Sequence, residues 1–196
     1  MNNQYPIMAN ILKPIKIGRA EVDILDYTNK KLGLWETISG LRNQRYARLL
    51  VDGSTIMSDT PMEHRTNQWF VLNSYGDVLI GGLGIGMIVL AIQNKDNVNS
   101  ITVLEKSQDV IDCVLPQLPL NDKVKIIQAD VFTYKPETKY DCIYMDIWSY
   151  VNCDVYEEMK QLKRKYGHYL KPKSDSPNRF NECWAEDYAR TETRLY

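Results

Sequence analysis

Short apolar runs alternate with helical patterns along the middle of the chain, and their spacing predicts a sheet of parallel strands. Residues 78–80 are all apolar, as expected for a buried parallel strand, and glycines follow them at once. Residues 87–92 are then apolar enough for a helix that packs on a sheet. Strand, glycine turn and helix form the first half of a nucleotide-binding βαβ unit.

Three further strands are predicted at residues 101–104, 124–127 and 140–145. Ser107 is expected to cap the helix after the second strand, and a helix from Asp154, with Glu157 completing a capping box, is expected to end at Gly167. This alternation predicts an α/β fold, a Rossmann-like open, mostly parallel sheet with helices on both faces. The right-handed crossover rule makes 3-2-1-4 the expected strand order.

The N-terminal part of the chain has the shorter alternation of antiparallel strands. Residues 15–17 and 20–25 flank a turn at Gly18 and Arg19. Residues 46–51 form a third strand that ends at Asp52-Gly53, a strong turn signal before residues 54–57. A small β-hairpin region therefore precedes the parallel sheet.

A helix with clear start signals links the two regions. Thr60 suits the N-cap, Pro61 the first helical position, and Glu63 completes a capping box with Thr60. The helix should run to about Asn73. His64 lies in its first turn, where a surface role is favoured over a catalytic one.

These patterns divide the chain into a β-rich region at 1–60, a nucleotide-binding domain at 61–172 and a C-terminal tail at 173–196. The tail begins polar and ends in a short helix expected around residues 184–190. Since little chain follows the fourth strand, the C-terminal part of the sheet is expected to be truncated.

Composition narrows the function classes. The 196 residues carry a net charge of −1, so no global field favours nucleic acid. No apolar run approaches the roughly 18 residues of a membrane span, and the first residues lack a signal-peptide pattern. We expect a cytoplasmic protein without membrane association.

Two kinds of partner stay open. An acid-free stretch at residues 160–173 carries six lysines and arginines, which allows local nucleic-acid binding. Exposed sheet edges could support a homodimer.

The cysteines and histidines argue against a metal site. The four cysteines are widely spaced and form no C-x-x-C pair, so buried free thiols are expected. The chain has two histidines, which makes a closed metal site unexpected.

An acidic residue stands at the end of three successive predicted strands. Glu105 ends the second strand, Asp130 follows the third and Asp146 follows the fourth. Ligands in such sheets bind at the carboxyl ends of the strands, near the change in strand order. Glu105 follows the glycine turn by about 20 residues, the spacing at which an acid accepts ribose hydroxyls. The sequence thus predicts a ligand site at this edge.

The motifs at these strand ends resemble the class I S-adenosylmethionine-dependent methyltransferases. They are GLGIG at 82–86, VLE at 103–105, QAD at 128–130 and YDCIYMD at 140–146. More narrowly, LEKSQDVI at 104–111 and LVDG at 50–53 are similar to motifs of the spermidine synthase branch. The resemblance covers about residues 45–150. It implies S-adenosylmethionine as the bound donor, with Glu105 on its ribose, Asp130 on its adenine, and the loop of Gly82, Gly84 and Gly86 around its methionine portion.

The chain departs from the spermidine synthases after the fourth strand. That branch carries D-S-x-D-P there, whereas this chain has DIWSY at 146–150, so only Asp146 remains of the two acids. We therefore predict a methyltransferase of unknown acceptor, with Asp146 as catalytic base, as an acceptor that orients the nucleophile, or as a ligand of the donor's amino group. Trp148 and Tyr150 could line an acceptor pocket. An aminopropyltransferase relative and a non-catalytic nucleotide-fold module are the alternatives.

Overall fold

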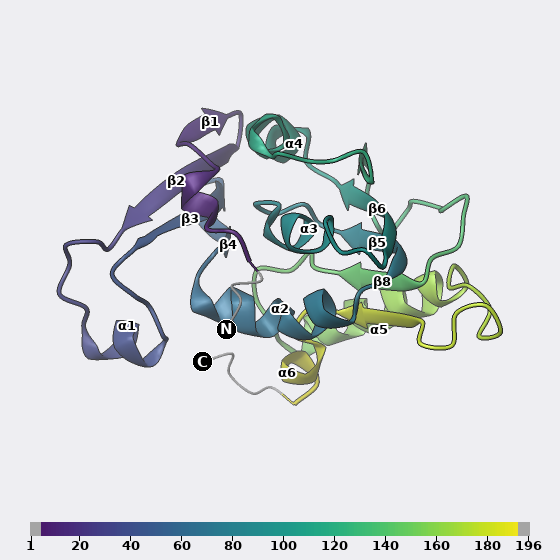
Figure 1. The fold of residues 1–196 in the computed structure, drawn as a ribbon. Coiled ribbons are helices and arrows are strands. Elements are labelled where there is room, and N and C mark those ends of the chain that lie inside the picture. The colour runs from purple at the N-terminus through teal and green to yellow at the C-terminus, as the bar shows by residue number, and fades with distance from the viewer. Residues whose placement is uncertain (1–4, 192–196) are drawn as a thin grey trace.

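The N-terminal region forms the predicted antiparallel sheet. The computed structural model describes residues 5–191, and its first sheet has the order β1-β2-β3-β4 (Figure 1). Its strands are β1 (Ile15–Ile17), β2 (Ala20–Asp26), β3 (Arg45–Val51) and β4 (Ser54–Ser58). All neighbours pair antiparallel, so both predicted hairpins are confirmed.

The second sheet is parallel throughout and has the order β7-β6-β5-β8-β9. Its strands are β5 (Gly76–Gly81), β6 (Val98–Glu105), β7 (Val124–Gln128), β8 (Cys142–Met145) and β9 (Phe180–Cys183). The first four of these strands in chain order give 3-2-1-4, so the predicted order is confirmed. β9 adds a fifth strand that the sequence analysis did not predict.

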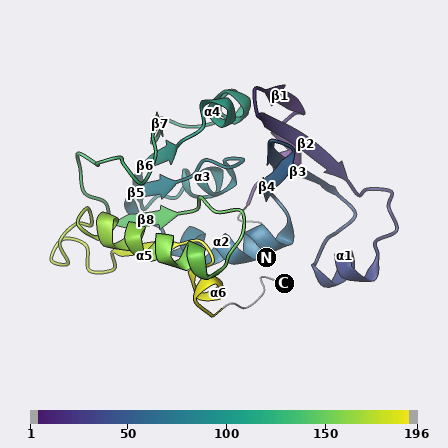
Figure 2. The same cartoon turned by 180° about the vertical axis from the view of Figure 1, so that it is seen from behind.

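Helices cover both faces of the parallel sheet (Figures 1 and 2). One face packs against α2 (Pro61–Asn73), α3 (Met87–Ile92) and α4 (Gln108–Val114). The other packs against α5 (Cys153–Gly167) and α6 (Glu186–Thr191). Successive residues of β5 divide between the two cores, since Val78 and Ile80 belong to the first and Leu79 to the second. Three short elements complete the fold: η1 (Met8–Asn10), α1 (Leu34–Ile38) and η2 (Leu115–Gln117).

β9 escaped prediction because its sequence, FNEC, is short and half polar. Asn181 is buried there, and its amide donates a hydrogen bond to the backbone carbonyl of Lys163 in α5 at 2.8 Å. This partner comes from a remote helix, so no local pattern reveals the strand. The short C-terminal helix is present as α6, which begins at Glu186 rather than Trp184.

Two predicted capping boxes are wrong. α2 has Thr60 as its N-cap residue, Pro61 at its start and Asn73 at its end, as predicted, but the Thr60 side chain makes no cap hydrogen bond, and its hydroxyl pairs instead with that of Ser58 at 3.1 Å. Glu63 therefore completes no capping box and is buried. α5 begins at Cys153, one residue before the predicted start, because the Asn152 side chain accepts the Val155 N–H at 2.9 Å and caps the helix in place of Asp154.

The antiparallel sheet contacts α4 through an acid. The backbone N–H of Arg19, at the β1–β2 turn, donates to Asp109 of α4 at 2.9 Å. Within the N-terminal region, Asp59, 2% exposed, accepts the backbone N–H of Met8 at 2.8 Å and of Ala47 at 2.7 Å. Asp59 thus joins the end of β4 to β3 and to η1.

A lysine joins the amino ends of the two central strands. Lys171 Nζ lies 2.7 Å from Oδ2 of Asp77, in β5, and 2.7 Å from Oδ2 of Asp141, just before β8. The Asp77 N–H also donates to Asp141 Oδ2 at 2.7 Å. Lys171 thus compensates two carboxylates, of which Asp141 is buried.

We expect Lys171→Met to lower the free energy of unfolding by about 2 kcal/mol, because it leaves the buried Asp141 carboxylate without its cation. Urea denaturation measures the change. Lys173→Met, which removes an exposed lysine two residues away, is the matched control and should stay within about 0.5 kcal/mol of wild type. Equal losses in the two variants would contradict this role of Lys171.

Candidate functional site

A cavity of about 700 Å³ lies at the carboxyl ends of the parallel strands. Five of the six predicted site residues line it: Gly82, Gly84, Glu105, Asp130 and Asp146. Gly86 does not line it and packs against Leu118. The volume falls within the roughly 300–1,000 Å³ of small-molecule sites. The antiparallel sheet supplies part of the wall through Leu49, Val51, Ile56 and Met57.

The glycine turn packs closely against neighbouring segments of the chain. Gly82, Gly84 and Gly86 have φ values of +95°, +51° and +77°, in the left-handed region. A Cβ on Gly82 would overlap the carbonyl oxygen of Asp146, and one on Gly84 would overlap the sulfur of Met57. The turn can therefore lie against the chain leaving β8 and against β4 only without side chains at these two positions.

Glu105 connects the glycine turn to the start of α4. Its Oε2 accepts the backbone N–H of Leu83 at 3.0 Å, and its Oε1 accepts that of Ser107 at 2.8 Å. Each carboxylate oxygen can accept a further hydrogen bond. The backbone thus orients a carboxylate that still has acceptor capacity toward the cavity.

Asp130 is held in its ionised form. Its Oδ1 accepts the Phe132 N–H at 2.8 Å, and Lys106 Nζ lies 3.0 Å from its Oδ2. The Phe132 N–H first, and then the Lys106 ammonium, hold the pKa of Asp130 below its usual range. Asp130 is thus a fixed hydrogen-bond acceptor beside Phe132.

Asp146 lies in a different electrostatic environment. It directly follows β8, and its backbone N–H donates to the Gly81 carbonyl at 2.8 Å. Burial raises the pKa of its carboxyl from 3.8 to about 7. Near neutral pH this group can therefore accept or release a proton.

The sequence analysis missed Glu63 as a cavity residue. Glu63 is 7% exposed, lines the cavity, and has its pKa raised to about 8, first by burial and then by the Asp146 charge. The spacing of Glu63, Asn67 and Phe70, i, i+4 and i+7, places them on one face of α2, and all three are buried. This spacing is the sequence pattern from which the burial of Glu63 could have been predicted.

The cavity is strongly acidic. Six carboxylates line it, against two basic side chains. The six are Glu63, Glu105, Asp109, Asp130, Asp146 and Glu158. Both bases are already paired, Arg19 with Asp52 and Lys106 with Asp130. Trp148 also lines the cavity and donates from its indole N–H to Glu158 at 2.8 Å, whereas Tyr150 does not line it.

His64 is half-buried rather than fully on the outer surface. Its ring stacks on that of Tyr5 with centroids 4.5 Å apart. Burial lowers the pKa of His64, so the ring is neutral at pH 7. Neither the His64 Nε2 nor the Tyr5 hydroxyl has a hydrogen-bond partner within residues 5–191.

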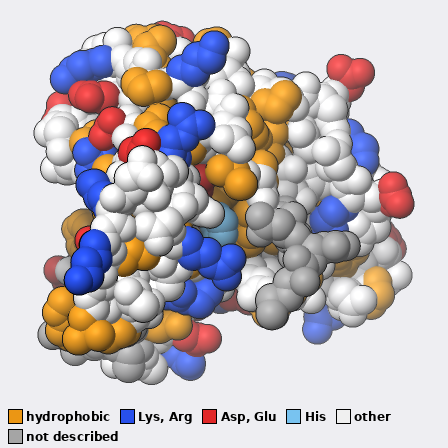
Figure 3. All heavy atoms as spheres, turned by 60° about the vertical axis from the view of Figure 1, so that its left-hand side comes forward, with side chains coloured by type: hydrophobic (Ala, Val, Ile, Leu, Met, Phe, Trp, Pro, Cys, Tyr) orange, Lys and Arg blue, Asp and Glu red, His pale blue; other side chains and the backbone are white. Residues whose placement is uncertain are grey.

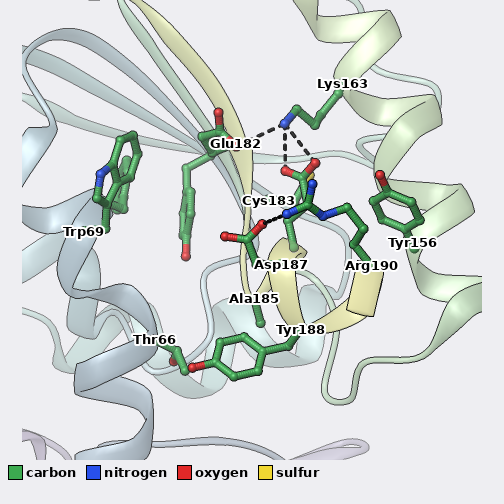
Figure 4. A pocket seen from close by; sticks show the side chains of 13 residues that line it. Thr66, Trp69, Tyr156, Lys163, Glu182, Cys183, Ala185, Asp187, Tyr188 and Arg190 are labelled. Carbon is green, nitrogen blue, oxygen red and sulfur yellow. Dashed lines mark hydrogen bonds and ion pairs between the residues drawn. The ribbon is translucent and has the colours of Figure 1, made fainter. Parts of the chain in front are cut away.

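A second cavity, of about 450 Å³, lies between α2, α5, β9 and α6 (Figure 4). Trp69 stands on one wall, and Tyr156 and Lys163 on the opposite one. Lys163 bridges Glu182 at 3.0 Å and Glu186 at 2.7 Å. None of the predicted donor-binding residues lines this cavity.

The basic stretch at 160–173 is largely engaged within the protein. Lys160 pairs with Glu157, Lys163 with Glu182 and Glu186, and Lys171 with Asp77 and Asp141. Lys165 donates to the Val131 carbonyl at 2.8 Å. On the face drawn in Figure 3, acidic and basic side chains both appear among hydrophobic ones. Within residues 5–191, no helix combines the length and apolar character needed to cross a membrane.

Sequence comparisons identify no relatives: no protein-family model matches the chain, and a search of curated proteins finds no match. Solved structures match part of the fold. The plantazolicin methyltransferase BpumL, in complex with a pentazolic desmethylPZN analog and SAH, is 19% identical with a TM-score of 0.44, over 58% of this chain and 45% of that one. The DhpI-SAH complex is 19% identical with a TM-score of 0.45, over 56% and 52%.

The N-methyltransferase NodS from Bradyrhizobium japonicum WM9 is 16% identical with a TM-score of 0.46, over 58% of this chain and 65% of that one. This chain thus spans less than two thirds of the length of each of the three structures. None of the three is a spermidine synthase, so they lend no support to the narrower resemblance.

We expect Gly82→Ala to lower the free energy of unfolding by more than about 3 kcal/mol, because left-handed strain of about 1–2 kcal/mol is joined by overlap with the Asp146 carbonyl. Gly53→Ala is the matched control. Gly53 also has a left-handed φ, +76°, but nothing lies within 4 Å of an added Cβ. It should cost about 1 kcal/mol in urea denaturation. Similar losses at both positions would show that close approach to Asp146 does not constrain the turn.

Stability should fall as pH rises from about 5 to 8. Glu63 and Asp146 have folded-state pKa values of about 8 and 7, above their ordinary 4.5 and 3.8, so folding takes up protons in this range. Replacing both by Glu63→Gln and Asp146→Asn should reduce the fall by at least about 1 kcal/mol, since one unit of pKa shift is worth about 1.4 kcal/mol.

Urea denaturation at pH 5, 6, 7 and 8 measures both proteins. Two other groups also affect the pH dependence: the lowered pKa of His64 opposes the fall in stability below pH 6.5, and the pKa of Asp59, about 6, adds to it. Both groups are present in both proteins, so the difference in pH dependence between the proteins reports Glu63 and Asp146 alone. An unchanged pH dependence in the double variant would refute the assignment of raised pKa values to Glu63 and Asp146.

Proposed function

We propose that this protein is an S-adenosylmethionine-dependent methyltransferase whose donor binds in the 700 Å³ cavity. One observation carries the proposal. The glycine turn and the acids at three successive strand ends, Glu105, Asp130 and Asp146, all line a single cavity at the change in strand order.

The geometry supports a role for each residue. Glu105 accepts the two ribose hydroxyls of the donor, since both its oxygens have acceptor capacity beyond the N–H groups that orient them. Asp130, kept ionised, accepts from the adenine amino group. The backbone of Gly82 and Gly84, which line the cavity, would hold the methionine portion.

The charge of the cavity favours this donor over phosphate-bearing nucleotides. A pyrophosphate needs cations or free helix N-termini, whereas six acidic side chains line this cavity and its two bases are paired with acids. A sulfonium donor carries positive charge and is attracted by the same carboxylates.

When bound, the donor supplies a methyl group already activated by its sulfonium, so the protein has mainly to bind, orient and exclude water. Asp146 is the residue placed to hold or take the proton of the acceptor, since its pKa of about 7 matches proton transfer near neutral pH. The apolar wall of Met57, Ile147 and Trp148 excludes water beside it.

Calorimetric titration with S-adenosylmethionine and S-adenosylhomocysteine tests the proposal. We expect micromolar binding of both, weakened about 10- to 100-fold by Glu105→Ala, because two hydrogen bonds to a charged acceptor are lost. Glu137→Gln, which removes an exposed carboxylate outside the cavity, should bind like wild type.

The outcomes separate the alternatives. Absence of binding to either ligand overturns the enzyme proposal and leaves a non-catalytic module. Tighter binding of decarboxylated S-adenosylmethionine than of S-adenosylmethionine would indicate aminopropyl transfer instead.

A further inference from the structure

The helix α1 presents three apolar side chains that the rest of the described chain leaves uncovered. Leu34, Trp35 and Ile38 are 72%, 78% and 63% exposed, and α1 contains no buried residue. Their spacing, i, i+1 and i+4, places them on one side of the helix. Figures 1 and 2 both show α1 at the end of an arm that leaves the antiparallel sheet. These three side chains are called the α1 tip below.

Hydrogen bonds within the arm fix the α1 tip. The Glu36 carboxylate accepts the Gly33 N–H at the start of the helix. At the base of the arm, the Asn43 amide donates to the carbonyl of Tyr27 at 3.0 Å and to that of Lys30 at 2.7 Å. A contact surface that is held in place before binding loses little conformational entropy when a partner covers it. The arm is therefore suited to docking.

The arm that carries the α1 tip is basic. Residues 26–45 contain four lysines and arginines against two acids, whereas the whole chain has a net charge of −1. Within residues 5–191, neither Lys31 nor Arg42 forms an ion pair. Packing the α1 tip of one copy on that of another would bring two basic arms together, so charge complementarity favours an acidic surface as the partner.

The second cavity has the matching character. Five aromatic side chains line it, among them Trp69 on one wall and Tyr156 on the opposite one (Figure 4). Its charged side chains are three acids and two bases, so its net charge is opposite in sign to that of the arm. Its volume of about 450 Å³ lies within the roughly 300–1,000 Å³ of small-molecule sites, so it can receive an indole ring.

The α1 tip does not occupy the second cavity of its own chain. No residue of α1 lines that cavity, and the α1 tip stays exposed. Trp69 on the cavity wall is itself 52% exposed. One chain thus carries a convex apolar surface and a concave aromatic surface of opposite charge that do not contact each other.

We propose that the α1 tip of one copy of this chain docks into the second cavity of another copy. The reciprocal contact closes a two-fold symmetric dimer, because a single contact of three side chains is small against the roughly 1,200–2,000 Å² of a stable interface, and a two-fold axis makes the contact twice. This inference is independent of the proposed function, since the 700 Å³ cavity shares no residue with α1 or with the second cavity.

Analytical ultracentrifugation of the full-length protein tests the proposal. We expect wild type to form a dimer with a micromolar dissociation constant. Trp35→Glu should weaken the dimer about 100-fold, because each of the two contacts loses its indole and gains an acid beside the acids of the cavity. Tyr150→Glu is the matched control. Tyr150 is an aromatic residue that is 62% exposed and lies outside α1 and the second cavity, so its replacement should leave the dimer unchanged.

A mixing experiment identifies the surface that receives the α1 tip. Trp69→Arg places a cation on the cavity wall and should weaken self-association as Trp35→Glu does. The two variants together still have one intact contact, between the α1 tip of the Trp69→Arg chain and the second cavity of the Trp35→Glu chain. The mixture should therefore form a heterodimer at least tenfold more stable than the dimer of either variant alone.

Folding is controlled separately. Trp35 is 78% exposed, so its replacement should leave the midpoint of thermal unfolding unchanged. Trp69 packs edge-on against Phe180 with centroids 4.9 Å apart, so Asp187→Lys serves as a second cavity variant that keeps this contact. The Asp187 side chain is 85% exposed, and reversing its charge should weaken the dimer about tenfold. All variants should bind S-adenosylhomocysteine within twofold of wild type.

The proposal is overturned if wild type stays monomeric throughout the micromolar range, or if Tyr150→Glu weakens the dimer as much as Trp35→Glu. Binding of a monomeric wild type to vesicles of anionic lipid, lost in Trp35→Glu, would identify a membrane surface as the partner instead. A dimer that Trp35→Glu disrupts but that mixing does not restore would overturn the second cavity as the surface that receives the α1 tip.

Discussion

The close packing of the turn after β5 against the chain leaving β8 is the constraint on which the site depends. Gly82 accommodates the Asp146 carbonyl where a side chain would overlap it, and its N–H donates to Leu104 at 2.8 Å. The neighbouring Gly81 carbonyl accepts the Asp146 N–H at 2.8 Å. One turn is thus held between the ends of β6 and β8. This packing brings Glu105 and Asp146 to the same cavity, although they belong to strands on either side of β5.

The strand ends could be predicted from the sequence because they depend on local patterns. Apolar runs predict the strands, and the crossover rule predicts their order. The acids are then placed at the carboxyl edge of the sheet because they directly follow these strands in the sequence. Glu63 and β9 depend on remote partners instead. Glu63 is buried in the wall of the cavity, and the amide N–H of Asn181 in β9 donates to a carbonyl of α5. Such non-local partners override capping and hydrophobicity patterns, so local rules assigned Glu63 to the wrong role and missed the strand.

The two ends of the parallel sheet differ in whether a cation contacts their acids. At the amino ends, the Lys171 ammonium lies between Asp77 and Asp141 and forms an ion pair with each. At the carboxyl ends, Glu63 is buried and Asp146 half-buried, and neither forms an ion pair with a lysine or arginine within residues 5–191. Their removal from water raises both pKa values, and carboxyl groups with raised pKa values are typical of functional sites. The ion pairs that stabilise the sheet therefore lie at the amino ends of the strands, and the groups suited to chemistry lie at the carboxyl ends.

The hydrogen bond from Arg19 to Asp109 joins residues that lie 90 positions apart, and it has a consequence for the order of events on the ribosome. At about 5–20 residues per second, the β1–β2 hairpin leaves the ribosome roughly 5–20 seconds before α4 follows it. During that interval the four antiparallel strands, whose neighbours are consecutive along the chain, have only one another to pair with. The residues of the first sheet, which include one wall of the cavity, are thus synthesised as a consecutive meander before the strands that complete the cavity.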